Sequence, residues 1–169
     1  MWDESTGVAA GVGIASGAEL TRALFVRDLF ALRSALSIPA LHPPVTVRPV
    51  DDVPEDAWDR WWAALLDRHP SSWAVPGDAR LAELAHAVDE DARRWEDEHV
   101  TSEPPYDGRW ISTWLVDHRL VAPVEVLLVG AGGVWHEEAR PGRFLVSVGF
   151  FRAQDLMDAM LCRALESRA

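Results

Sequence analysis

Apolar side chains recur at three- and four-residue spacing in four stretches of the chain, which is the period of an amphipathic α-helix. Pro54, followed by Glu55 and Asp56, suits the start of the second stretch. Proline fits the first helical turn, and acids complement the positive end of the helix dipole. Breaking residues at 39–44 and 69–72 end the first and second stretches. The predicted helices span residues 18–36, 54–68, 78–98 and 153–165.

Other stretches are rich in β-branched and aromatic residues, which favour strands. Residues 124–129 and 144–151 predict two strands that pair as an antiparallel hairpin, with a tight turn at residues 140–143. Residues 45–47 predict a further short strand. The apolar positions of segment 109–119 fit a helix face and also alternate as those of a strand would, and we favour the helix.

This order of elements predicts an α+β fold. We expect several helices to pack on a small, mainly antiparallel sheet that contains a C-terminal β-hairpin followed by a helix. The length of 169 residues favours one domain, which we assign to residues 18–169. Residues 1–17 are dominated by glycine, alanine and serine, and they predict a flexible N-terminal arm.

The composition indicates a source and a compartment. All 16 basic residues are arginine, and both lysine and asparagine are absent. A GC-rich genome has this effect because lysine and asparagine codons are AT-rich, so we expect a bacterial protein. Cys162 is the only cysteine and cannot form an internal disulfide. The N-terminus is acidic, unlike a signal peptide, and no run reaches the ~20 apolar residues of a membrane helix. We therefore expect a soluble protein of a reducing cytoplasm.

The net charge of −11 lies in the middle of the chain. Residues 51–108 contain 16 acids and five arginines, whereas acids and arginines balance on either side of this segment. Such a surface repels nucleic acid and anionic lipid, both of which need basic patches. It attracts a basic protein surface and speeds the encounter with it. The alternative interpretation is that these carboxylates are solvated helix faces that only keep the protein soluble.

No motif fixes a reaction. The glycine-rich stretch at residues 130–133 follows a predicted strand, but it lacks the third small residue and the helix of a dinucleotide site. Glu83 with His86, and Glu96 with His99, have the spacing found in di-iron sites. Both pairs lie on one predicted helix, roughly 220° apart around its axis, so they cannot converge. We therefore expect neither a cofactor nor a metal.

Tryptophan is unusually frequent, with nine residues in the chain. These rings form either a tryptophan-heavy core or an interface, where tryptophan is enriched. Together with the charge, they predict a non-enzymatic domain that binds a basic partner protein through residues 51–108. An inhibitor or immunity-type protein fits this class, as does an adaptor. The candidate contact residues are Asp56, Asp59, Trp62, Asp67, Trp73, Glu83, Glu90 and Asp97.

The alternative prediction is a small-molecule-binding protein or an enzyme. Its pocket would lie between the sheet and the helices and would be lined by tryptophan and histidine. The candidate residues are His118, Trp135 and His136. The chain has no Gly-x-Ser-x-Gly nucleophile motif, and no spacing points to a catalytic triad, so we favour the non-enzymatic interpretation.

Overall fold

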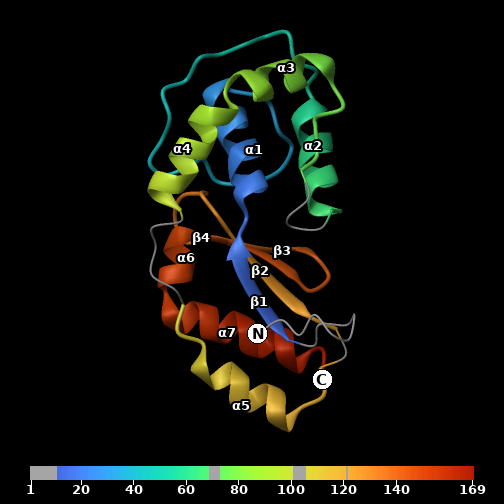
Figure 1. The fold of residues 1–169 in the computed structure, drawn as a ribbon, viewed down its shortest axis with the longest axis vertical. Coiled ribbons are helices and arrows are strands. Elements are labelled where there is room, and N and C mark those ends of the chain that lie inside the picture. Colours follow the sequence, from blue (N-terminus) through green and yellow to red (C-terminus); the bar gives the residue numbers. More distant parts are fainter. Residues whose placement is uncertain (1–10, 69–72, 101–105, 121) are drawn as a thin grey trace.

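The structure is a computed structural model, which describes residues 11–68, 73–100, 106–120 and 122–169. Within these residues, seven helices accompany one four-stranded sheet (Figure 1), and the predicted α+β class is confirmed. The helices are α1 (Ala18–Leu29), α2 (Ala57–Leu66), α3 (Ala79–Ala87), α4 (Asp89–His99), α5 (Arg109–Asp117), α6 (Val148–Arg152) and α7 (Gln154–Glu166). The strands are β1 (Val12–Ser16), β2 (Val124–Val129), β3 (His136–Arg140) and β4 (Arg143–Ser147).

The sheet is mixed rather than mainly antiparallel, with the strand order β1-β2-β4-β3. Strand β2 pairs in parallel with both β1 and β4, and only β3 and β4 pair antiparallel. The predicted hairpin and its turn at residues 140–143 exist, but β3 and not β2 is the hairpin partner of β4. Strand β2 is buried on both faces except at the half-buried Glu125, as parallel strands are, and such a mostly apolar run carries no signal for strand direction.

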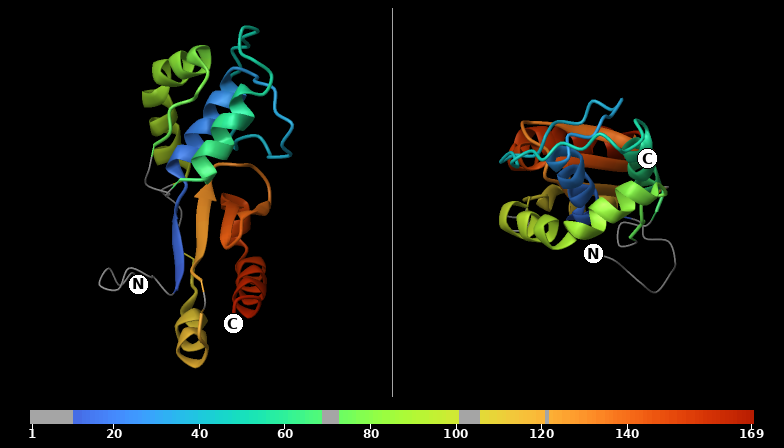
Figure 2. Two further views of the ribbon diagram at one scale, coloured as in Figure 1. Left: turned by 90° about the vertical axis from the view of Figure 1, so that its right-hand side faces the viewer. Right: turned by 90° about the horizontal axis from the view of Figure 1, so that it is seen from above.

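The helices form two groups along the molecule. Figure 1 shows α1 to α4 gathered at one end, and the sheet with α5, α6 and α7 at the other. In the left view of Figure 2, α6 and α7 lie on one face of the sheet. Strand β1 runs directly into α1 through Gly17, where an added Cβ would lie 2.9 Å from Cγ1 of Val129. Glycine at this position therefore lets α1 start close to the end of β2.

Tryptophans of α2 fill the core of the helical end. Trp58 and Trp61 are buried, and each donates its indole N–H to a backbone carbonyl at 2.7 Å, that of Ala23 and that of Ala74 respectively. A buried tryptophan needs such a partner for its polar N–H. Of the two interpretations that the sequence left open for its tryptophans, a core or an interface, the core is correct for those of α2.

Helix α1 ends at Leu29, earlier than the predicted residue 36. Arg48 donates its backbone N–H to Leu29 O at 2.6 Å, and Val50 donates to Phe30 O at 3.3 Å. The segment after α1 therefore folds back and takes the carbonyls that a longer helix would use. Ala31, with a φ of 51°, makes the turn.

Four further predictions change. The predicted strand 144–151 ends at Ser147, and Val148–Arg152 form α6 instead. Residues 45–47 form no strand, and Arg48 and Val50 just after them pair with the end of α1. The predicted helix 78–98 is divided at Val88 into α3 and α4. The predicted flexible arm is wrong for residues 12–16, which form strand β1, because parallel pairing with β2 needs only backbone groups. Residues 1–10 of the predicted arm lie outside the described residues. The favoured helix at 109–119 is observed as α5. Within the described residues, no helix is long and apolar enough to cross a bilayer.

Candidate functional site

Seven of the acidic residues of the middle segment lie on α3 and α4. Helix α4 alone carries six acids and two arginines. Glu83 on α3 and Glu90 and Asp97 on α4 are exposed, as predicted for contact residues. We call the exposed carboxylates of Glu83, Glu90, Asp91 and Asp97 the acidic face.

Several of these carboxylates lie near arginines of the same two helices. Glu83 lies 3.1 Å from Arg80, and Arg94 lies 4.0 Å from Glu90 and 3.7 Å from Asp91. Exposed pairs of this kind contribute about 0–1 kcal/mol to stability. Arg80 and Arg94 offset part of the negative charge of the acidic face, and because such exposed pairs are weak, a partner's cation can replace either arginine at little cost.

The other predicted contact residues have structural surroundings. Asp59 accepts hydrogen bonds from Ser34 Oγ at 2.6 Å and from the backbone N–H of Ala35 at 2.9 Å, and so it fixes the loop after α1. Trp62 is only 3% exposed and stacks on Trp58 at 5.1 Å, so its prediction as a surface contact is wrong. The hydrophobic spacing of α2 placed Trp62 on the buried face already.

Two more predicted acids lie away from the acidic face. Asp67, just after α2, pairs with Arg140 of β3 at 2.8 Å and so connects the helical end with the sheet. Asp56, at the start of α2, is exposed and lies 3.3 Å from Arg60. The acidic face therefore consists of α3 and α4 carboxylates, and not of the whole segment 51–108.

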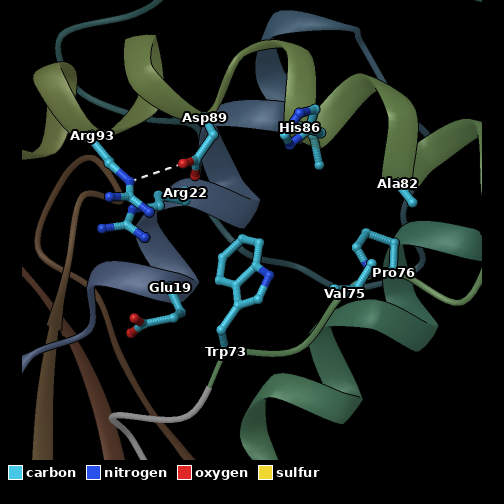
Figure 3. Close-up of a pocket in the computed structure, with 10 residues that line it drawn as sticks. Glu19, Arg22, Trp73, Val75, Pro76, Ala82, His86, Asp89 and Arg93 are labelled. Carbon is cyan, nitrogen blue, oxygen red and sulfur yellow. Dashed lines mark ion pairs between the residues drawn. The ribbon is translucent and has the colours of Figure 1, made fainter.

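A pocket of about 290 Å³ lies between α1, α3, α4 and the segment that follows α2. Figure 3 shows the indole of Trp73 pointing into the space between these elements. Trp73 is 39% exposed, and its ring meets the buried ring of Trp61 edge-on at 6.0 Å. His86 and Ala82 of α3 form the opposite wall. We call this the Trp73 pocket.

Charged side chains line the end of the Trp73 pocket next to α1. Glu19 and Arg22 come from α1, and Asp89 and Arg93 come from α4, where they form an ion pair at 2.9 Å (Figure 3). Nε of Arg22 is buried and has no hydrogen-bond partner in the described structure. An unpaired buried donor costs about 1–3 kcal/mol, which makes Arg22 the most unusual polar group of the pocket.

A buried carboxylate connects this charged group with the sheet. Glu96 of α4 is 4% exposed, and its Oε1 accepts a hydrogen bond from Ser16 Oγ at 2.8 Å, at the end of β1. Burial raises the pKa of Glu96 above its usual value, and neighbouring Asp97 adds to this. The hydrogen bond from Ser16 and the charge of Arg22 oppose the rise.

Sequence reasoning missed Arg22 and Glu96, although their helices carry a signal. Asp89, Arg93 and Glu96 have i, i+4, i+7 spacing, which places three charges on one face of α4. Asp89 and Arg93 on this face line the Trp73 pocket, and Glu96 is buried.

The residues of the alternative pocket do not come together. His136 lines a separate groove of about 290 Å³ with Arg163 and Arg168, and its ring stacks on Phe150 at 4.4 Å. Burial and the charge of Arg163 lower the pKa of His136. His118 is exposed on α5 and stacks on Trp114 at 4.1 Å. The backbone N–H of Trp135 donates to Ser147 Oγ at 2.9 Å, and Trp135 does not line the His136 groove. Neither His118 nor Trp135 lines the groove of His136, so the three residues do not form one site.

The two Glu-x-x-His pairs have separate surroundings. His86 lines the Trp73 pocket, whereas His99 stacks on Trp95 at 4.8 Å and its Nδ1 contacts the Trp95 carbonyl at 2.8 Å. Among the described residues, no group of three histidine, cysteine or acidic side chains is placed to hold a metal ion.

Comparisons with protein-family models, curated proteins and solved structures give no match for this chain. The functional argument therefore depends on the fold and on the chemistry of the residues described above.

Proposed function

We propose that this chain is a non-enzymatic interaction domain that binds a basic partner protein through the acidic face and the Trp73 pocket. The observation that carries the proposal is a partly exposed tryptophan in a pocket whose walls come in part from α3 and α4, the two helices that carry the acidic face. The partner would be a cationic protein, such as a toxin or nuclease, that the chain inhibits. Alternatively, the chain is an adaptor that links a basic protein to a second protein.

The two parts of this surface would have different tasks. Long-range attraction by the acidic face speeds the encounter and selects a basic partner. Trp73 supplies a large apolar surface in a hollow, and tryptophan in such a position is typical of residues that dominate binding energy. His86 and Ala82 leave room for one partner side chain against the indole.

We also propose a bacterial, cytoplasmic setting for this activity, from the arginine-only composition and the lone Cys162. Burial raises the pKa of the Cys162 thiol, and the charges of Glu166 and Asp158 add to this. A thiol with a raised pKa is a poor nucleophile, which favours a binding role over thiol catalysis.

The test uses two variants with the same change in charge. The first, Glu83→Gln/Glu90→Gln/Asp91→Asn, removes three negative charges from the acidic face. The control, Asp117→Asn/Asp155→Asn/Glu166→Gln, removes three from α5 and α7, at the opposite end of the molecule (Figure 1).

Proteins captured from the source cell by the immobilised chain are identified, purified and titrated against all three forms. At about 0.5 kcal/mol for each exposed charge pair, the first variant should lose roughly 1.5 kcal/mol, or about tenfold in affinity. The control should bind like the wild type, and added salt should weaken binding. If no captured protein distinguishes the two variants, the proposed function is wrong.

A second candidate function is supported by the unpaired Nε of Arg22. An anionic, planar small molecule would stack on Trp73 and bring negative charge towards Arg22 and Arg93. Calorimetric titration with benzoate and indole-3-acetate tests this. Binding that is lost in both Trp73→Ala and Arg22→Gln supports the candidate, and no heat with either compound rejects it.

A further inference from the structure

The two edges of the sheet differ in their protection. Strand β3 has the sequence HEEAR, its pairing shifts between Glu138 and Arg140, and both of these residues form ion pairs. Charges and irregular pairing are the usual means by which proteins protect an edge strand. Strand β1, at the other edge, has the uncharged sequence VGIAS and exposes its last three residues. By these criteria, and within the part of the chain that the structure describes, β1 is an unprotected edge.

The hydrogen bonds of β1 show which of its backbone groups face outward. Val124 donates its N–H to Gly11 O at 3.0 Å, and Gly17 donates to Leu128 O at 2.8 Å. With the parallel register of β1 and β2, the odd-numbered residues of β1 therefore direct their N–H and C=O groups to β2. Val12, Ile14 and Ser16 direct theirs to the open edge, and this alternating row is what an added strand pairs with.

We propose that β1 accepts an extended, positively charged segment of the partner as a fifth strand of the sheet. This inference rests on the proposed basic partner. The backbone groups of Val12, Ile14 and Ser16 would supply the pairing, and the side chain of Ile14, which is 39% exposed, would meet an apolar residue of the segment.

Charge at the end of β1 decides between a basic segment and a second copy of this chain. Ser16 Oγ donates a hydrogen bond to the buried carboxylate of Glu96 at 2.8 Å, and the exposed Asp97 follows Glu96 on α4. An exposed carboxylate therefore follows the residue that Ser16 contacts, and the whole chain carries a net charge of −11. A second copy would bring the same charge to this edge, whereas arginine or lysine in a foreign segment would be attracted to it.

The experiment uses a random twelve-residue peptide library displayed on phage and selected on the full chain. Selected peptides are synthesised, and their affinity is measured by fluorescence polarisation. We expect alternating apolar and basic residues. The test variant is Ile14→Pro, which removes one outward N–H but leaves the backbone hydrogen bonds of Gly13 and Ala15 to β2. The control is Ile14→Thr, which keeps this N–H and a side chain that favours a strand.

Ile14→Pro should weaken peptide binding by at least about tenfold, because one hydrogen bond is lost and the proline ring blocks the edge. Ile14→Thr should stay within about threefold of the wild type, since the backbone bonds remain. In case Ile14→Pro fails to fold, amide exchange in the wild-type complex gives a second readout. The N–H groups of Val12, Ile14 and Ser16 should become protected when peptide binds.

Peptides that bind Ile14→Pro as tightly as the wild type, or that leave these three amides unprotected, overturn the inference. So does a wild-type dimer that Ile14→Pro converts to a monomer, because the occupant is then a second copy. If the acidic-face variant keeps its captured partner while Ile14→Pro loses peptide, the proposed function fails and strand addition stands.

Discussion

The replacement Trp61→Phe tests how the core of α2 positions the Trp73 pocket. Trp61 is 2% exposed, donates its N–H to Ala74 O at 2.7 Å and supports the ring of Trp73. The change leaves the Ala74 carbonyl without its partner, at about 1–3 kcal/mol, and leaves a gap beside the smaller ring, at about 1 kcal/mol. We therefore expect a loss of about 2–4 kcal/mol in the free energy of unfolding. For a chain of this length that corresponds to a fall of about 5–12 °C in Tm.

Trp95→Phe is the matched control for this prediction. Trp95 is also buried, but its indole N–H donates no hydrogen bond to a described residue. The same exchange of rings should then cost only the gap, about 1 kcal/mol. Urea unfolding of both variants gives the two free energies. Equal losses for Trp61→Phe and Trp95→Phe would refute the assigned role of the hydrogen bond to Ala74.

Three further predictions concern one helix cap and two groups whose pKa values are shifted in the folded state. Asp78 Oδ1 caps α3 by accepting a hydrogen bond from the N–H of Leu81 at 2.9 Å. Asp78→Ala should therefore lower the free energy of unfolding by about 1 kcal/mol, and Asp78→Asn should lower it much less. Urea unfolding measures both changes. The folded state raises the pKa of Glu96 above 4.5, so the free energy of unfolding should fall as pH rises from 4.5 through the folded pKa. Unfolding curves across that pH range should show this fall in the wild type and not in Glu96→Gln. Since burial lowers the pKa of His136 below 6.5, stability should fall as pH drops below 6.5, and His136→Gln should abolish that fall in thermal melts.

Local patterns predicted the elements whose burial is periodic along the chain. The spacing of Trp58, Trp61, Trp62 and Leu65 identified the buried face of α2, and all four side chains are buried. The turn between β3 and β4 was also predicted, because proline followed by glycine at 141–142 is a strong local signal, and Gly142 has a φ of 80°.

Elements that depend on distant partners were not predictable in the same way. Strand β3 is charged and lacks apolar alternation, so nothing in HEEAR indicates a strand until β4 lies beside it. The apolar spacing of α1 continues to Leu32 and Leu36, and the helix ends earlier only because Arg48 takes the carbonyl of Leu29.

The candidate site was predicted in part. The charge distribution pointed to α3 and α4, and Trp73 was among the predicted contact residues. The position of Arg22 near Asp89 and Glu96 depends on how α1 packs against α4, and this packing is set by apolar side chains that are far apart in sequence. Trp62 was misplaced because charge and burial were considered for the segment as a whole and not for each face of α2.

The central claim is that the acidic face and the Trp73 pocket bind a basic protein. Hydrogen–deuterium exchange of the chain, alone and with the captured partner, measures this directly. We predict slower exchange in α3, α4 and residues 73–76, with α5 and α7 unchanged. Protection confined to α5 and α7, with α3 and α4 exchanging as in the free chain, would contradict the claim.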